Sequence, residues 1–284
     1  MRPSDKMASS SSLGLFSPES QEGECINWAE LPSELLLSIL SRLDTIDILE
    51  NAQKVCTSWR RVCKDPALWR KINMRKLGKL GYNIETLCRH VVDLSQGGLV
   101  ELDFGYMGPE SLLSYIADRS SNLRSLKLEI VYPITTEGLT KALGKLPLLE
   151  KLEVAHFTRW EAYLKVAGQS CPNLKTLKLH CFGTGPPWYM YDDDALVIAE
   201  TMPRLSHLQL FANKLTDAGL NAILDNCPDL EHLDLRQCSN VNLVGDMEKR
   251  CSERIKVFRR PRDTSHVTYS ENEDLFTLDA DYDQ

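Results

Sequence analysis

The chain has 284 residues, of which 26% are charged and 43% apolar, and its formal net charge is −7. Proteins that bind phosphate backbones carry a strongly basic field, so this balance argues against a nucleic acid as partner. No apolar run approaches the roughly 18 residues that a membrane-spanning helix needs. We therefore expect neither a nucleic-acid nor a membrane partner, and we expect the protein in the nucleus or the cytoplasm.

Residues 1–25 are rich in serine and poor in apolar side chains, a composition typical of a disordered leader. A transit peptide is the alternative, but such peptides avoid acidic residues. The leader contains Asp5, Glu19, Glu22 and Glu24. We therefore expect this segment to be a leader without a targeting role.

The nine cysteines indicate neither disulfides nor a metal site. Their number is odd, no secretory signal precedes them, and no Cys-x-x-Cys pair occurs. Reduced thiols in an intracellular protein are therefore expected. Cys171 and Cys227 each stand three residues before the first Leu of a repeat described below, and Cys251 follows Cys227 by 24 residues. This regularity predicts small, buried side chains.

Residues 26–72 are predicted to form a small helical unit. Pro32 is preorganised for the first position of a helix. An apolar stripe at helical spacing follows it, formed by Leu35, Leu36, Ile39, Leu40 and Leu43. A second helical stretch runs from Asp44 to Asp65, where Pro66 ends it. About 45 residues cannot bury this many large apolar groups alone, so some should lie against a partner or the next unit.

The motifs of this unit resemble an F-box. They read Trp28-x-x-Leu31-Pro32-x-Glu34-Leu35-Leu36-x-x-Ile39-Leu40-x-x-Leu43, Val55-Cys56-x-x-Trp59-Arg60 and Asp65-Pro66-x-Leu68-Trp69. The resemblance implies a set of residues that meet a Skp-type adaptor or support the surface that does: Leu31, Pro32, Leu35, Ile39, Leu43, Val55, Cys56 and Trp59. The alternative is a purely internal helical core, which we favour for Leu40 and Val62.

Residues 54–79 contain nine Lys or Arg residues and one acid, Asp65. One interpretation is a solvated helical face. The other is a basic flank that steers an acidic adaptor, which affects association rate more than affinity.

Residues 73–98 are expected to be a linker or a capping segment, and residues 99–262 a series of repeats. Six copies of Leu-x-x-Leu-x-Leu, with Val or Phe in some last positions, are spaced 24, 26, 25, 31 and 25 residues apart. They start at Leu99, Leu123, Leu149, Leu174, Leu205 and Leu230, and a seventh copy is degenerate. A period of this size is typical of a solenoid, whose units bury their apolar faces against one another.

Each repeat is predicted to be a strand, a turn and a capped helix. The predicted N-cap residues are Thr135, Thr158, Asp192, Thr216 and Asn242. The predicted fold class is therefore α/β, with N-terminal all-α F-box helices followed by a leucine-rich-repeat solenoid. In such a solenoid a curved parallel sheet lines the concave side and helices line the convex side.

An F-box followed by leucine-rich repeats resembles the plant F-box/leucine-rich-repeat proteins named for interacting with the Skp adaptor. The resemblance implies a non-catalytic substrate receptor of an SCF-type ubiquitin ligase, joined through the adaptor to cullin and RING subunits. The alternative is a leucine-rich-repeat scaffold that acts outside a ubiquitin ligase. We expect no enzyme activity and no cofactor, because the sequence has no Gly-rich phosphate loop, His-x-x-x-His pair or Gly-x-Ser-x-Gly elbow.

A protein substrate is expected on the concave face, where strand residues between the leucines point outward. The candidates are His180, His207, Phe211, His232 and Arg236, with Trp188 and Tyr189 from the loop that lengthens one repeat. Phe211 and Arg236 are the predicted anchors, because interface hot spots favour aromatic residues and Arg. Packing of Phe211 under a neighbouring loop is the alternative.

His207 and His232 occupy the same position of adjacent repeats, about 4.8 Å apart across parallel strands. They are either a metal pair or, as we favour, two exposed surface histidines. We expect no metal site.

Two further segments keep alternatives open. Residues 183–194 form either a protruding recognition loop or a loop folded back over the core edge. Residues 263–284 form an acidic tail, with six acids and no Lys or Arg in 271–284, which is either disordered or a docking segment.

Overall fold

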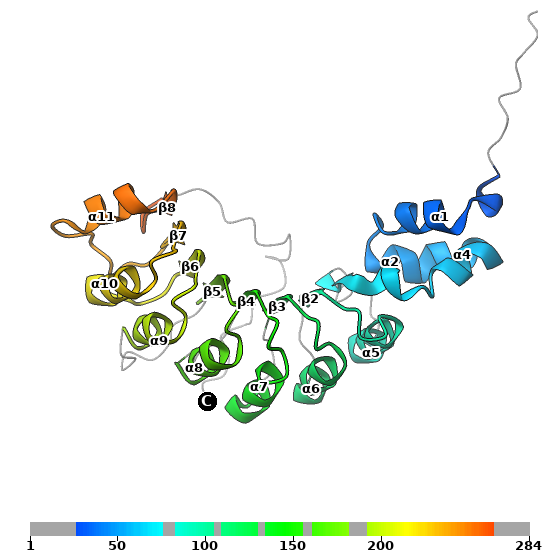
Figure 1. The fold of residues 1–284 in the computed structure, drawn as a ribbon, viewed down its shortest axis with the longest axis horizontal. Helices are drawn as coiled ribbons and strands as arrows, with labels where there is room; N and C mark the ends of the chain where they lie inside the picture. The colour runs from blue at the N-terminus through cyan, green and yellow to red at the C-terminus, as the bar shows by residue number, and fades with distance from the viewer. Residues whose placement is uncertain are drawn as a thin grey trace, which may run out of the picture.

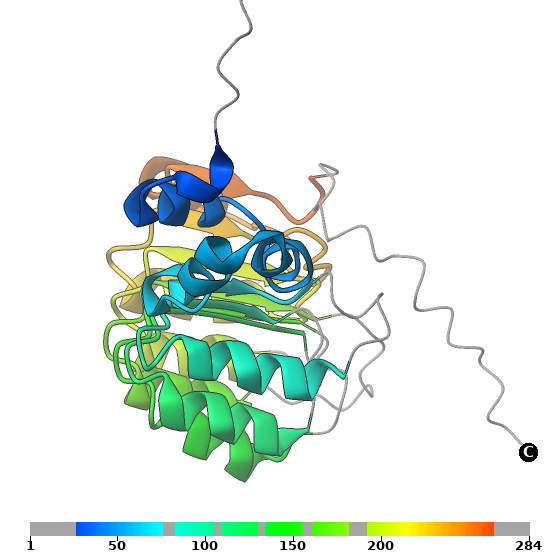
Figure 2. The same cartoon turned by 90° about the vertical axis from the view of Figure 1, so that its right-hand side faces the viewer.

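The computed structural model describes residues 27–75, 83–104, 109–129, 134–155, 161–181 and 192–263. The predicted leader, Thr158, Trp188, Tyr189 and nearly all of the acidic tail lie outside these residues. The described chain forms a crescent, with strands along its inner side, helices along its outer side and a helical unit at one end (Figure 1). Viewed along the array from the helical unit, helices and strands form two layers (Figure 2).

The helical unit consists of short segments. They are η1 (Trp28–Glu30), α1 (Ser33–Leu40), α2 (Thr45–Asp47), the π-helical η2 (Ile48–Ala52), α3 (Gln53–Val55), α4 (Thr57–Val62) and η3 (Pro66–Arg70). Pro32 lies at the N-cap of α1 and not, as predicted, at its first helical position, because the helix begins at Ser33. Cys56 is extended, with φ −160° and ψ 177°, and so separates α3 from α4.

Eight parallel strands lie in sequence order in one sheet. The strands are β1 (Lys71–Asn73), β2 (Glu101–Phe104), β3 (Ser125–Glu129), β4 (Lys151–Ala155), β5 (Thr176–His180), β6 (His207–Phe211), β7 (His232–Asp234) and β8 (Val257–Arg259). The helices are α5 (Ile84–Leu94), α6 (Glu110–Arg119), α7 (Thr136–Leu143), α8 (Glu161–Ser170), α9 (Asp193–Thr201), α10 (Asp217–Asn226) and α11 (Met247–Arg254). This arrangement confirms the predicted α/β solenoid.

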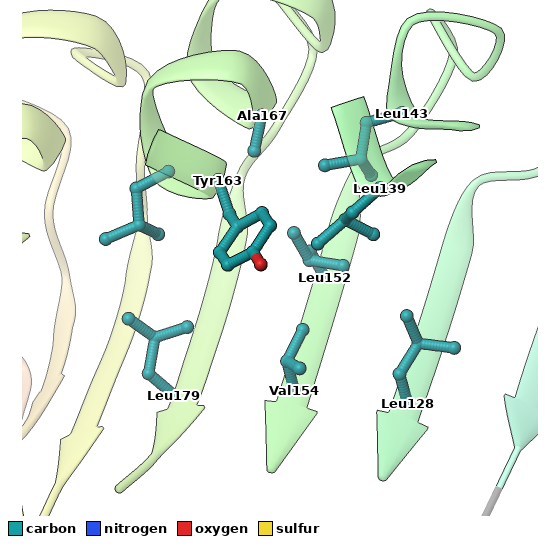
Figure 3. Close-up of a pocket in the computed structure, with 9 residues that line it drawn as sticks. Leu128, Leu139, Leu143, Leu152, Val154, Tyr163, Ala167 and Leu179 are labelled. Atoms are coloured by element: carbon teal, nitrogen blue, oxygen red, sulfur yellow. The ribbon is translucent and has the colours of Figure 1, made fainter. Parts of the chain in front are cut away.

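The repeat leucines form an in-register row through the sheet, as their spacing predicts. Leu102, Leu126, Leu152, Leu177, Leu208 and Leu233 are aligned between neighbouring strands, and each is at most 4% exposed. Between the sheet and α7 and α8, Tyr163 lies among leucines of both layers (Figure 3). The void there is only about 10 Å³, far below the volume of a ligand site, so this part of the interior is a packed core.

The helical unit is joined to the solenoid through the sheet. Strand β1 directly follows η3 and pairs in parallel with β2. Trp69 at this junction is 1% exposed, and its indole N–H donates to the carbonyl oxygen of Cys63 at 2.9 Å. The segment predicted as linker or cap contains α5, whose Cys88, Val91 and Val92 join the core.

Two of the predicted helix caps are confirmed, and two others differ. The Thr135 hydroxyl accepts from the Gly138 N–H, and the Thr216 hydroxyl accepts from the Ala218 N–H. Asp192 lies at the N-cap of α9 but accepts no bond from that helix. The prediction for Asn242 is wrong, because α11 begins only at Met247.

The cysteines behave as their spacing predicts. All eight cysteines in the described part of the chain are free thiols. Cys171, Cys227 and Cys251 are at most 1% exposed, and burial raises the pKa of each thiol to about 11. They are therefore neutral core side chains at physiological pH.

Candidate functional site

Exposed apolar side chains are concentrated on the helical unit. Of nine large apolar residues exposed in the described part of the chain, five lie between residues 28 and 55. These five, which we call the apolar patch, are Trp28 (53% exposed), Leu35 (55%), Ile39 (36%), Leu43 (40%) and Val55 (58%). Leu35 and Ile39 are four residues apart and so share one face of α1. Exposed apolar patches of this kind mark protein–protein contact surfaces.

The other residues named for the adaptor are less uniform in their exposure. Pro32 is exposed, whereas Leu31, Cys56 and Trp59 are half-buried. The Trp59 indole N–H donates to the Trp28 carbonyl oxygen at 3.0 Å, which ties the start of the unit to α4.

The boundary between patch and core follows the expected division. Leu40 and Val62 are 0% and 5% exposed, so both belong to the core, as predicted. Trp28 was absent from the predicted contact set. Its place at the start of the first motif, ahead of the apolar stripe, is the signal that identifies it.

A basic flank borders the apolar patch. Six exposed cations lie between residues 54 and 71: Lys54, Arg60, Arg61, Lys64, Arg70 and Lys71. Lys54 pairs with Glu50 and Lys71 with Glu101, both on the surface. This stretch is basic, although the whole chain carries a formal net charge of −7.

The concave face differs from the prediction at its third outward position. His180, Phe211 and Arg236 are 2%, 4% and 5% exposed. The guanidinium of Arg236 folds back onto Asp234, with Nη2 2.6 Å from Oδ2, and lies 6.0 Å from the centroid of the Phe211 ring. The predicted exposure of His180 and Arg236 is therefore wrong. For Phe211 the structure agrees with the alternative that the ring is packed and not exposed, and all three residues belong to a buried row.

His207 and His232 form a stacked pair. They are in register on β6 and β7, and their half-buried rings are nearly parallel, 12° apart, with centroids separated by 4.0 Å. Burial, and then His232, lower the pKa of His207. Parallel rings direct their nitrogens along separate planes, and no group of three or more potential metal ligands occurs among the described residues. Both rings are half-buried on the concave face and not fully exposed as predicted.

A cavity of about 320 Å³ lies beside this pair at the rear end of the concave face. We call this hollow the rear cavity. It is lined by Lys178, His207, Leu208, Gln209, His232, Leu233, Asp234, Arg236, Val257 and Arg259. The two-residue period of the strands predicts that Lys178, Gln209 and Asp234 face outward on this side of the sheet. It does not predict that they line a hollow. Arg259 was not foreseen, because the degenerate seventh repeat hides β8.

No helix in the described ranges combines the length and the hydropathy of a membrane span.

Comparison with known proteins identifies the family. The F-box-like family matches residues 28–75. The chain is 58% identical over 277 residues to F-box protein SKIP19 of Arabidopsis thaliana, covering 95% of this chain and 89% of that protein. It is 50% identical over 299 residues to putative F-box/LRR-repeat protein 21 of the same plant, covering 93% and 97%. It is 29% identical over 247 residues to F-box protein SKIP1, also of Arabidopsis thaliana, covering 76% and 80%. The chain belongs to the plant F-box/leucine-rich-repeat proteins.

Proposed function

We propose that this protein is the substrate-recognition subunit of an SCF-type E3 ubiquitin ligase. The helical unit binds a Skp-type adaptor, which links it to cullin and RING subunits, and the concave face binds a protein substrate. Its role is non-catalytic, because it holds the substrate near a conjugating enzyme that carries the ubiquitin. We place this activity in the nucleus or the cytoplasm.

The apolar patch carries this proposal. Five large side chains remain exposed in a unit that buries Leu36, Leu40 and Trp69 almost completely. The unit therefore has a packed core, and its exposed apolar side chains are available to a partner. Burying a side chain of this size contributes roughly 1.5–3 kcal/mol. The patch coincides with residues 28–75, which match the F-box-like family.

Co-purification with a Skp-type adaptor tests the proposal. We expect Leu35→Asp combined with Val55→Asp to abolish binding, because both side chains are exposed and a carboxylate at each site opposes burial. Val244→Asp is the matched control, since Val244 is 71% exposed but lies beyond α10 at the opposite end of the array.

Retained binding by the double variant would refute the assignment of the patch. Equal loss in the control would show that any exposed carboxylate disrupts the complex. Adaptor binding without recruitment of cullin would support the alternative function, an interaction scaffold outside a ubiquitin ligase.

A further inference from the structure

The apolar patch on the helical unit lies open when no adaptor is bound. All five of its side chains are exposed, and an exposed apolar surface favours association with any apolar segment that reaches it. The proposed adaptor covers this surface only while the complex lasts. A segment of the chain itself that fits the surface can cover it at other times.

Exposed cations lie beside the patch. Arg60 Nε donates to the carbonyl oxygen of Gln53 at 3.1 Å, which holds the guanidinium against α3, next to Val55 of the patch. Arg61 on α4 and Lys64 just after it are also exposed. Within the described ranges, neither of these two side chains forms an ion pair. A segment that fits this surface therefore combines apolar side chains with acids on their flanks.

The C-terminal sequence has this composition. Residues 271–284 contain six acids and no Lys or Arg. Leu275, Phe276 and Leu278 stand together between Asp274 and Asp279. An apolar cluster bordered by carboxylates complements an apolar patch bordered by cations.

The rest of the described surface offers no comparable match. Its other exposed large apolar residues are spread over separate repeats: Leu148, Leu196, Val244 and Val257. The front of the concave face is polar and carries its own ion pairs, with Arg75 bound to Asp103 and Lys127 to Glu153. The apolar cluster of the tail would face only polar groups there.

The tail is long enough to reach the helical unit. The 21 residues from 264 to 284 span roughly 70 Å when extended. β8 and the helical unit lie at the two ends of the crescent (Figure 1), joined by a sheet of eight strands that lie about 4.8 Å apart. Because the tail is tethered to its target, a contact that is weak between separate molecules becomes effective.

We propose that residues 271–284 dock on the apolar patch and the basic flank of their own chain and compete with the adaptor for this surface. Leu275, Phe276 and Leu278 pack against the patch, and the acids on either side of them face the cations. The competition rests on the proposed function, because it requires that the adaptor binds the same patch. The docking itself does not depend on it. The tail thus acts as an autoinhibitory cover that the adaptor displaces.

A labelled peptide tests the docking without an adaptor. The probe is a fluorescent peptide with the sequence of residues 264–284. Its target is the full chain carrying Leu275→Ser, Phe276→Ser and Leu278→Ser (the serine variant), whose own tail should leave the patch free. Anisotropy should show binding to the serine variant about tenfold or more tighter than to the wild-type chain, because the wild-type tail competes. A peptide with amides in place of the six acids should bind more weakly, since it loses the charges that face the flank.

Substitutions in the patch locate the contact. Adding Leu35→Asp and Val55→Asp to the serine variant should weaken peptide binding by about tenfold or more, because two large apolar contacts are lost. Adding Val244→Asp, at an exposed apolar residue far from the patch, is the matched control and should leave binding unchanged. In the full chain alone, backbone hydrogen exchange over residues 28–43 should be slower in the wild type than in the serine variant. The serine variant should also bind a Skp-type adaptor more tightly than the wild type.

Four results would overturn the proposal, with unfolding transitions confirming intact folds. Peptide binding that is insensitive to Leu35→Asp with Val55→Asp would place the tail elsewhere. Equal peptide affinity and equal exchange in the wild type and the serine variant would show that the tail leaves the patch open. Protection that rises with protein concentration would make the tail of a second copy the occupant. Equal adaptor affinity of the two chains would refute the competition. Peptide binding at the patch without adaptor binding by either chain would count against the proposed function alone.

Discussion

At the scale of single residues, the strand period predicted which way a side chain points, but not what covers it. The leucines of β2–β7 point inward as predicted, and the first two outward positions of each strand are mostly half-buried or exposed. At the third outward position, Ala155, His180 and Phe211 are all buried. Their cover depends on contacts between neighbouring repeats, such as the Arg236 guanidinium lying 6.0 Å from the centroid of the Phe211 ring, and no local pattern encodes these.

The burial of His180 predicts a pH-dependent stability. Burial lowers its pKa to about 4; Lys127 and Lys178 act in the same direction, while Glu153 and Asp234 oppose them. The unfolded residue titrates near pH 6.5. Between about pH 6.5 and about pH 4, the unfolded state therefore binds a proton that the native state does not bind. The free energy of unfolding should therefore fall as pH falls, by up to about 1.4 kcal/mol per pH unit from this residue.

Chemical denaturation at several pH values between 7.5 and 4.5 measures this effect. We expect the free energy of unfolding of His180→Asn to fall less steeply with decreasing pH than that of the wild type. His90 is exposed, so His90→Asn should have the same pH dependence as the wild type. Equal slopes for wild type and His180→Asn would show that another group causes the pH dependence of stability.

Leu208 tests the register of the repeat. It is 2% exposed and aligned with Leu177 and Leu233, so Leu208→Ala should lower the free energy of unfolding by about 2–5 kcal/mol through the cavity it leaves. Leu196→Ala, at a leucine that is 51% exposed, should cost about 0.5 kcal/mol or less. An unchanged unfolding curve for Leu208→Ala would contradict the observed core.

At the scale of elements, acidic residues at the start of three helices connect each of these helices to the next repeat. Glu110 of α6 accepts from the backbone N–H and the hydroxyl of Thr135, at 2.8 and 2.6 Å. Asp192 accepts from the same two groups of Thr216, both at 2.7 Å, and Asp217 accepts from the backbone N–H of Asn242 at 2.9 Å. The sequence predicted Asp192 as a cap for its own helix, whereas the structure shows it capping the next one.

The same repeat geometry explains two features that the sequence did not reveal. A Cβ atom at Gly219 would lie 2.3 Å from Asp192 Oδ1, so the close approach of the two repeats requires glycine. At the last repeat, Leu243 and Gly245 have φ of 55° and 66° and turn the chain before α11 begins. A capping residue alone cannot predict such a turn, which accounts for the error at Asn242.

Asp192→Ala tests the connection between repeats. It leaves three donors without their acceptor, namely two groups of Thr216 and the Gly219 N–H, and should lower the free energy of unfolding by about 1–3 kcal/mol. Asp193→Ala removes a carboxylate from the first turn of the same helix and should lower the free energy of unfolding by less. Thermal or chemical unfolding measures both variants. Equal costs would reduce the role of Asp192 to a helix-dipole effect.

At the scale of the whole molecule, the apolar patch and the rear cavity lie at opposite ends of one acidic chain. The domain order and the solenoid were predictable because the repeat period and the F-box motifs are long and redundant. The rear cavity was not, because its walls come from four strands and one of them, β8, lies in a repeat whose leucine pattern is lost.

The basic flank predicts a salt-dependent association with the adaptor. If it steers an acidic partner, the association rate should fall as ionic strength rises, and Arg60→Glu with Arg61→Glu should slow association while changing dissociation little. Stopped-flow or surface-based kinetics measure both rates. Lys249→Glu, an exposed charge reversal on α11, is the control. An association rate that depends on neither salt nor these arginines would favour a solvated face.

The continuous sheet also fixes a distance. Because β1 emerges from the helical unit and seven strand intervals separate it from β8, the path along the curved sheet from one end to the other is about 34 Å. Adding or deleting one repeat would change this separation in a step of about 5 Å. In the proposed complex, the number of repeats would therefore set how far from the adaptor a bound segment is held, and with it which lysines of a substrate come within reach of the conjugating enzyme.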